Sequence, residues 1–185
     1  MPKQLLQPQG EFPVVGLGRR LAAMFYDFLL CTALLMVTTL VYKMVQMAII
    51  GETRMRALTE AGALDGDPLL STVLLFMLFG FFAKFWTHGG QTLALKTWQL
   101  RLVTPQGGPI APLRALLRYL TSWLWFIPPL LLTWLAGWHD KGSITAAVLG
   151  WMVLYAALTW VLPSRQFLHD VISGTRVIDN RKQVP

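Results

Sequence analysis

Four long apolar runs, separated by polar segments, dominate the pattern of the chain. The runs lie at about residues 19–42, 69–86, 119–138 and 143–162, and a continuation of the first helix past Lys43 to Ile50 stays open. Each is close to the length of about 20 residues that a helix needs to cross the hydrocarbon core of a bilayer. The pattern therefore predicts an all-α membrane protein, a bundle of about four transmembrane helices.

The third apolar run contains two adjacent prolines, Pro128 and Pro129. Proline removes a backbone donor and disrupts the interior of a helix. The pair therefore predicts that this span is kinked or divided into two half-helices. Two interpretations stay open, a broken helix at a binding site, as in some transporters, or a kink without a functional role.

The chain outside the spans predicts two tails around one transmembrane domain. Residues 1–17 hold several prolines and glycines and are expected to form an irregular cytoplasmic tail. Residues 18–178 form the transmembrane domain, and residues 179–185 form a C-terminal tail. Between the second and third spans, the segment Thr92–Val103 mixes apolar and basic residues, which predicts an amphipathic cytoplasmic segment that leads into a short strand.

Composition supports the membrane prediction. Hydrophobic residues make up 55% of the chain and charged residues only 14%, against about 25% charged residues in soluble domains. The mean hydropathy is +0.51. The net charge of +7 comes from basic residues beside the apolar runs and not from a basic soluble domain, so the composition argues against a nucleic-acid-binding protein.

The distribution of basic residues predicts the orientation of the chain. Of the 16 lysines and arginines, only Lys43, Arg54, Arg56 and Lys141 fall on the side opposite the termini. Because cytoplasmic loops carry the excess of lysine and arginine, both termini and the central loop are expected in the cytoplasm. The expected environment is thus a lipid bilayer with anionic lipids at the cytoplasmic face.

The sequence contains no recognisable catalytic constellation, so no enzymatic activity is expected. Cys31 is the single cysteine, and the three histidines are far apart in the sequence. No metal site and no cofactor are expected from this pattern.

Arg20 and Asp27 introduce charge into the first apolar run. They are seven residues apart, which places them on nearly the same face of a helix and about 10 Å apart along its axis. An ionisable side chain within a membrane helix is costly and needs a partner or water. Asp27 is therefore a candidate site for a proton or a cation, or alternatively a buried structural carboxylate.

A second polar group follows the last span, where Arg165, His169 and Asp170 lie close in sequence. Asp170 is expected on the same side of the membrane as Arg20, Arg101 and Arg118, and any of these arginines could pair with it. Two roles stay open for this group, a salt-bridged connection to the bundle or a functional gate.

Polar residues of the central loop complete the candidate site. Gln91 and Thr92 follow two glycines and can hydrogen-bond or cap the next helix. Arg101 and Arg118 are supporting basic residues, and Lys96 and Arg114 are placed to contact lipid phosphates at the interface.

Arg20, Asp27 and Asp170 resemble, in this order, the Arg-Asp-Asp set for which the RDD family of small bacterial membrane proteins is named. The order of the other motifs is also similar: Gly90-Gln91-Thr92, Leu100–Val103, a Gly-Gly-Pro turn, Arg118 and Gly174–Ile178. The resemblance covers roughly residues 16–178. It implies a multi-pass protein of the bacterial plasma membrane with transport activity, which in some members is sodium/proton exchange.

Two functional hypotheses follow. In the first, the protein exchanges a monovalent cation for protons: Asp27 binds the proton or cation, Arg20 regulates it electrostatically, and Asp170 with His169 gates the cytoplasmic side. Four helices leave little room for a complete pathway, so a homo-oligomer is expected. In the second, the protein is a non-transporting scaffold or accessory subunit that binds a partner protein or anionic lipid.

Overall fold

The computed structural model describes residues 15–63 and 65–181. Its helices and strands, in chain order, are α1 (Leu17–Ile50), α2 (Glu52–Glu60), α3 (Pro68–Thr87), α4 (Leu93–Thr97), β1 (Leu100–Val103), α5 (Pro112–Ser122), the 3-10 turn η1 (Trp123–Trp125), α6 (Ile127–Leu135), α7 (Lys141–Val161), α8 (Leu168–Ile172) and β2 (Arg176–Asp179).

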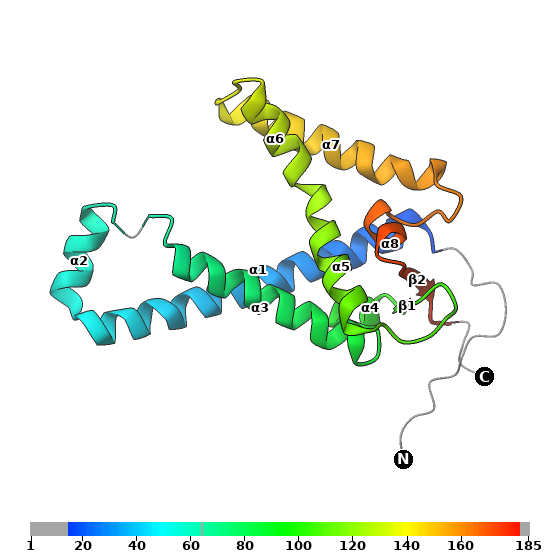
Figure 1. The fold of residues 1–185 in the computed structure, drawn as a ribbon, viewed down its shortest axis with the longest axis horizontal. Helices are drawn as coiled ribbons and strands as arrows, with labels where there is room; N and C mark the ends of the chain where they lie inside the picture. Colours follow the sequence, from blue (N-terminus) through cyan, green and yellow to red (C-terminus); the bar gives the residue numbers. More distant parts are fainter. Residues whose placement is uncertain (1–14, 64, 182–185) are drawn as a thin grey trace, which may run out of the picture.

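Two helical arms extend from a common base (Figure 1). The first arm is the pair α1 and α3, which lie side by side and are joined at the far end through α2. The second arm is the pair α6 and α7, which α5 and η1 connect to the base. The base consists of α4, β1, α8 and β2 with the adjoining ends of α1, α3 and α5. The arms diverge, so contacts between distant parts of the chain concentrate in the base.

The long helices have the length and composition of membrane spans. Among the described residues, α1, α3 and α7 are each long and apolar enough to cross a membrane, and the bent pair Pro112–Trp125 and Ile127–Leu135 makes a fourth span if it is counted as one. The prediction of an all-α membrane protein with about four spans is confirmed. Of the two expected ends of the first helix, near residue 42 or at Ile50, the structure has the second: α1 has 34 residues, because no helix-breaking residue occurs before Gly51, which has a φ of 82°.

The third span is divided, as the prolines predict. The two parts meet at a bend of 42°. Pro128 and Pro129 lie in the first turn of α6, where the missing backbone N–H groups have no helical partner in any case. The prolines therefore begin a second helix after η1 and do not disrupt the interior of one.

The base contains a two-stranded antiparallel sheet. β1 pairs with β2 in a register that places Leu100 opposite Asp179 and Val103 opposite Arg176. The strand expected in the central loop is confirmed as β1, whereas β2 was not predicted. The sheet brings the segment after α8 back against the loop between the second and third spans.

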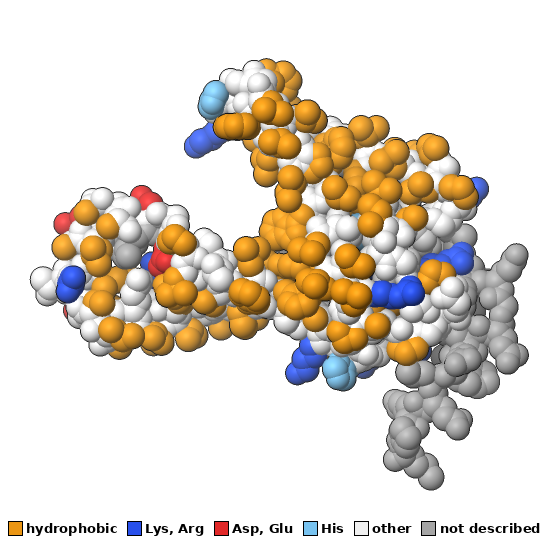
Figure 2. Space-filling model, viewed as in Figure 1, with side chains coloured by type: hydrophobic (Ala, Val, Ile, Leu, Met, Phe, Trp, Pro, Cys, Tyr) orange, Lys and Arg blue, Asp and Glu red, His pale blue; other side chains and the backbone are white. Residues whose placement is uncertain are grey.

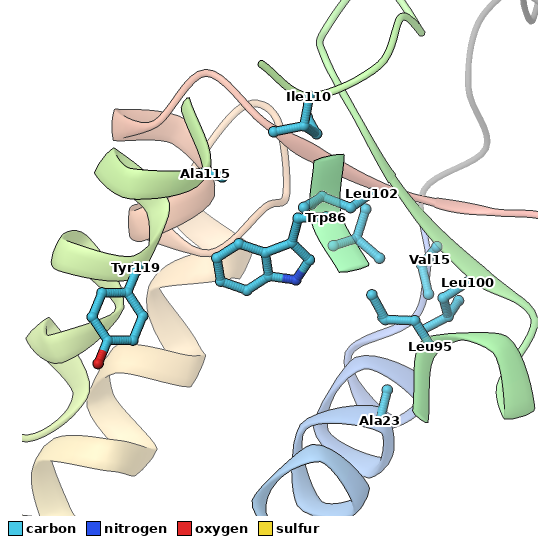
Figure 3. Close-up of a cluster of buried hydrophobic side chains, with 10 residues drawn as sticks. Val15, Ala23, Trp86, Leu95, Leu100, Leu102, Ile110, Ala115 and Tyr119 are labelled. Carbon is cyan, nitrogen blue, oxygen red and sulfur yellow. The ribbon is translucent and has the colours of Figure 1, made fainter. Parts of the chain in front are cut away.

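Buried apolar side chains hold the base together. Figure 3 shows Trp86 of α3 beside Ala115 and Tyr119 of α5 on one side and Leu102 of β1 on the other. The Tyr119 hydroxyl donates to the backbone oxygen of Leu75 at 3.1 Å and so links α5 to α3. This core fixes the ends of α3 and α5 relative to the sheet.

Many apolar side chains lie on the face of the two arms that Figure 2 shows. Phe28, Phe76, Leu131 and Val153 are among the large hydrophobic residues that remain exposed. Contiguous exposed apolar surface of this extent marks contact with lipid or with other apolar surfaces. The arms are thus the part of the molecule that contacts the lipid bilayer.

Gly90 joins α3 to the base at a point where only glycine fits. Its φ is 72°, and a Cβ atom at this position would overlap the carbonyl oxygen of Leu102. Gly90→Ala is expected to lower the free energy of unfolding by about 1–3 kcal/mol, because the residue must adopt a left-handed conformation and displace a backbone group. Thermal unfolding in detergent micelles measures this loss.

Gly80→Ala is the matched control, since Gly80 lies within α3 and open space surrounds its missing Cβ atom. It is expected to keep or slightly raise the stability. Equal stability of the two variants would contradict the role assigned to Gly90.

Candidate functional site

Charged and hydroxyl side chains from four helices and two loops lie at the base. We call this set the polar cluster; its members are Arg20, Asp27, Thr92, Arg118, Tyr155, His169, Asp170 and Thr175. All except Asp27, which is half-buried, are buried side chains. Polar groups at such depth are stable only when they are paired or hydrogen-bonded, so the partners of each one matter.

Arg118 and Asp170 form a buried ion pair between α5 and α8. The guanidinium Nη1 of Arg118 contacts Oδ1 of Asp170 and donates to Oγ1 of Thr175 at 2.9 Å. The Cζ atom of Arg118 also lies 4.9 Å from the ring centroid of Trp86. Of the three arginines that the sequence offered to Asp170, the structure therefore selects Arg118.

Asp27 receives its hydrogen bond from the central loop. Oγ1 of Thr92 donates to Oδ2 of Asp27 at 2.9 Å. The same hydroxyl accepts from the backbone N–H of Leu95 at 3.1 Å and so caps α4, as Thr92 was expected to cap a helix. The other carboxylate oxygen, Oδ1, is buried and has no hydrogen-bond partner among the described residues.

Arg20 lies apart from Asp27, although both are on α1. The ion pairs found in residues 15–63 and 65–181 do not include this pair. Two helical turns separate the residues by about 10 Å along the axis, which is too far for direct contact. The guanidinium of Arg20 instead lies 4.8 Å from the ring centroid of Phe167.

His169 and Tyr155 connect α8 to α7. The Tyr155 hydroxyl accepts from the backbone N–H of His169 at 3.0 Å and lies 3.1 Å from its Nδ1. Nε2 of His169 lies 3.6 Å from Oδ1 of Asp170. A neutral ring with its proton on Nε2 fits both contacts, since the hydroxyl proton then points to Nδ1. Tyr155 was not predicted, because a tyrosine near the end of a span resembles an ordinary interface residue.

Burial holds the pKa of His169 well below its usual value, and the positive charges of Arg118 and Arg20 lower it further. The folded protein therefore keeps this imidazole neutral, whereas the unfolded chain takes up a proton below about pH 6.5. Stability from the neutral ring is fully present above that pH and decreases as the pH falls.

His169→Asn is expected to remove this acid sensitivity. Between pH 7 and pH 5 the free energy of unfolding of the wild type is expected to fall by about 1.4 kcal/mol per pH unit below pH 6.5. The variant keeps an acceptor for the Tyr155 hydroxyl but has no proton to gain. Chemical unfolding at several pH values measures the slope. His139→Asn, at an exposed position, is the control and should keep the slope of the wild type.

The other residues expected at the site have structural or surface positions. Gln91 donates from Nε2 to the backbone oxygen of Leu100 at 2.7 Å, and Arg101 donates from Nε to that of Gly89 at 3.0 Å. Arg114 donates to the backbone oxygen of Gly174 at 2.7 Å. Lys96 and Arg165 are exposed. The structure thus keeps these five residues near the base but outside the polar cluster.

A second group of ion pairs lies at the base, around Asp179 of β2. The sequence analysis did not predict it. Asp179 contacts Nη1 of Arg19 at 2.5 Å and Nη2 of Arg181 at 2.9 Å. Arg181 and Arg19 hold the pKa of this carboxyl below its usual range. Arg19 also donates to the backbone oxygen of Trp98 at 2.6 Å, so the start of α1 is connected to β2 and to the end of α4.

The polar cluster contains ion-paired side chains and, beside them, buried polar atoms that make no hydrogen bond to the described residues. Buried atoms without a partner among the described residues include Oδ1 of Asp27, Oδ2 of Asp170, Nε of Arg118, and Nε and Nη1 of Arg20. Within the same residues, no three His, Cys, Asp or Glu side chains gather in a way that could hold a metal ion. The cluster thus combines ion-paired side chains with buried polar atoms that could accept or donate further hydrogen bonds.

Comparison with known proteins identifies the chain at the level of a family. The searches of curated proteins and of solved structures returned no match. A model of the RDD family matches residues 14–174, a range that includes Arg20, Asp27 and Asp170. With most of its length matched, the chain belongs to the RDD family.

Proposed function

We propose that the protein is a transporter of the bacterial plasma membrane that exchanges sodium or potassium ions for protons, with Asp27 as the carboxylate that binds them. The observation that supports this proposal is the half-buried Asp27 in the first span, whose Oδ1 has no hydrogen-bond partner in residues 15–63 and 65–181. An ionisable residue in a membrane helix is a functional candidate by default. We propose no enzymatic activity.

The surroundings of Asp27 support reversible binding. Asp27 is half-buried, so its carboxylate is only partly solvated. Oxygen atoms are the ligands that hard cations prefer, and Asp27 offers one oxygen without a partner among the described residues, next to the oxygen that accepts from Thr92. A proton and a monovalent cation can therefore compete for the same group.

The proposed orientation places the base in or near the cytoplasm, with both termini on that side. The lysines and arginines of the chain, concentrated around the base, support this assignment through the positive-inside rule. Lys96 and Arg114 are then placed to contact anionic lipid phosphates. Because the two arms leave large apolar faces exposed, we propose that a homo-oligomer completes the pathway.

A second candidate function is a non-transporting scaffold or accessory subunit. The apolar surface of the α6–α7 arm favours it, since side chains such as Leu131, Trp134 and Val153 are exposed. In that case the polar cluster holds the base together, and the arm or the basic face contacts a partner protein or anionic lipid.

Proton movement in proteoliposomes separates the two functions. The purified protein is reconstituted with a pH-sensitive dye inside the vesicles, and sodium or potassium chloride is added outside. An exchanger is expected to move protons when one of these cations is added, at a rate above that of empty liposomes. No cation-dependent movement by correctly inserted protein would contradict the exchange proposal and favour the scaffold.

A further inference from the structure

Arg20 is a buried arginine without a counter-ion among the described residues. It lies in the first turn of α1 and is 4% exposed. The ion pairs found in residues 15–63 and 65–181 do not include Arg20, and its Nε and Nη1 atoms are buried there without a hydrogen-bond partner. A guanidinium stays charged in proteins, and a buried charge is stable only when it is paired. A negative charge is therefore needed next to Arg20.

The carboxylates described at the base do not supply this charge. Asp170 pairs with Arg118, and Asp179 belongs to the second group of ion pairs. Asp27 lies on α1 itself, but about 10 Å away along the helix axis. A water molecule could accept hydrogen bonds from Arg20, but it would not balance the charge. The counter-ion must therefore come from outside the described residues.

The aromatic cluster that Arg20 contacts contains a second buried donor. The Cζ atom of Arg20 lies 4.8 Å from the ring centroid of Phe167, and the centroid of the Trp125 ring lies 5.4 Å from the same ring. Nε1 of Trp125 is buried and has no hydrogen-bond partner among the described residues. Both side chains can donate hydrogen bonds, and neither can accept one. Unpartnered donors in one cluster, one of them charged, favour an oxyanion, because charge-assisted hydrogen bonds to its oxygens are strong.

The position of Arg20 favours the phosphate of a lipid headgroup as this oxyanion. The residue lies at the start of a candidate span, where the headgroups of a bilayer are found. On the same helix Leu21 and Phe28 are exposed, and Phe28 lies about two turns further along the span. A phosphate at Arg20 therefore leaves the acyl chains beside apolar side chains of α1. Nη2 of Arg20 is not among the buried atoms that lack a partner, so this nitrogen is open to such a ligand.

We propose that Arg20 binds the phosphate group of an anionic phospholipid, which is the counter-ion that the described residues do not supply. The planar fork of guanidinium N–H groups matches phosphate oxygens, and the phosphate balances a charge that is costly when buried alone. The site differs from a contact at the exposed Lys96, where the charge is solvated and screened. Asp27 takes no part in it, so the site is independent of the exchange function.

A bound phosphate reverses the effect of Arg20 on stability. Without lipid the unpaired charge destabilises the protein, so Arg20→Met should unfold at the same temperature as the wild type or at a higher one. With the lipid, the wild type gains the stabilisation that any ligand of the folded state provides and becomes the more stable protein. If Arg20 only packed against Phe167, Arg20→Met would be less stable by the same amount with and without lipid.

The test follows thermal unfolding of the full-length protein, purified in detergent and depleted of lipid. Phosphatidylglycerol, diacylglycerol or inorganic phosphate is added in increasing amounts, so that the phosphate and the acyl chains are varied separately. Phosphatidylglycerol is expected to raise the unfolding temperature of the wild type, and to bind Arg20→Met at least about tenfold more weakly. Diacylglycerol should produce no such difference. Arg20→Lys keeps the charge and should keep part of the shift. An equal shift with inorganic phosphate would support the same site with a free anion as its ligand.

Arg165→Met is the matched control, since it makes the same chemical change at an exposed position two residues before Phe167. It should keep the shift of the wild type, because an exposed charge contributes little. Equal shifts in the wild type and Arg20→Met would overturn the inference and favour Glu11, the only acidic side chain outside the described residues, as the counter-ion. An Arg20→Met protein that does not fold without lipid would overturn it as well, because the proposal requires that this variant is then at least as stable as the wild type.

Discussion

Asp27→Asn is expected to reduce cation-driven proton movement to the level of empty liposomes while the protein still folds and inserts. The amide keeps an oxygen that accepts from Oγ1 of Thr92, so the contact between α1 and α4 survives. The variant loses the group that binds and releases a proton. Because the neutral amide avoids the cost of a charge in an apolar helix, the free energy of unfolding should stay within about 1 kcal/mol of the wild type.

Asp140→Asn provides the matched control for this variant. Asp140 caps α7 and accepts from the backbone N–H of Ser143 at 2.7 Å, and asparagine caps a helix about as well as aspartate. The control makes the same chemical change at an exposed position on the far arm, and its proton movement should equal that of the wild type. Full activity of a well-folded Asp27→Asn protein would contradict the role of Asp27.

Asp170→Ala is expected to produce the largest loss of stability of any single substitution discussed above. It leaves the buried guanidinium of Arg118 without its carboxylate, and breaking a buried pair in this way costs about 3–5 kcal/mol. The connection between α5 and α8 loses its central contact. Thermal unfolding in detergent micelles, with the yield of monodisperse protein, measures the effect.

The double variant Arg118→Met/Asp170→Ala tests the cause of that loss. It removes both charges and fills part of the space with an apolar side chain, so it is expected to recover a substantial part of the stability lost in Asp170→Ala. A double variant less stable than the single one would show that the unpaired charge is not the reason for the loss.

The spans could be predicted because the bilayer imposes a simple requirement on composition. Apolar runs of sufficient length mark α1, α3 and α7, and the prolines mark the division of the third span into α5–η1 and α6. Helix ends were less predictable. The apolar pattern left two ends open for the first helix, one before Lys43 and one at Ile50. Lysine does not break a helix, and α1 ends at Ile50, before Gly51.

The contacts of the candidate site join residues that are far apart in the sequence. The pattern of neighbouring residues therefore does not predict them. Asp27 stands out in the sequence because it is a charge in an apolar run. Its partner Thr92 is 65 positions away in a loop, and helical spacing pointed to Arg20 instead. For Asp170, the predicted orientation in the membrane left three arginines as candidate partners. Only the packing of α5 against α8 shows that the partner is Arg118.

The C-terminal part of the base gave the weakest sequence signal. β2 has four residues and a single partner strand, so no periodic pattern distinguishes it from a tail. The contacts of Asp179 with Arg19 and Arg181 depend on this strand being in place. Both features follow from the pairing of segments far apart in the chain.

Protection of Asp27 from carbodiimide tests the central claim most directly. The wild-type protein in proteoliposomes is labelled at fixed pH with increasing sodium or potassium, and modification of Asp27 is quantified by peptide mass spectrometry. The exchange account predicts that one of these cations lowers the labelling, and that a lower pH restores it, because cation and proton compete for one carboxylate. Labelling of Asp27 that does not change with either cation would contradict the account.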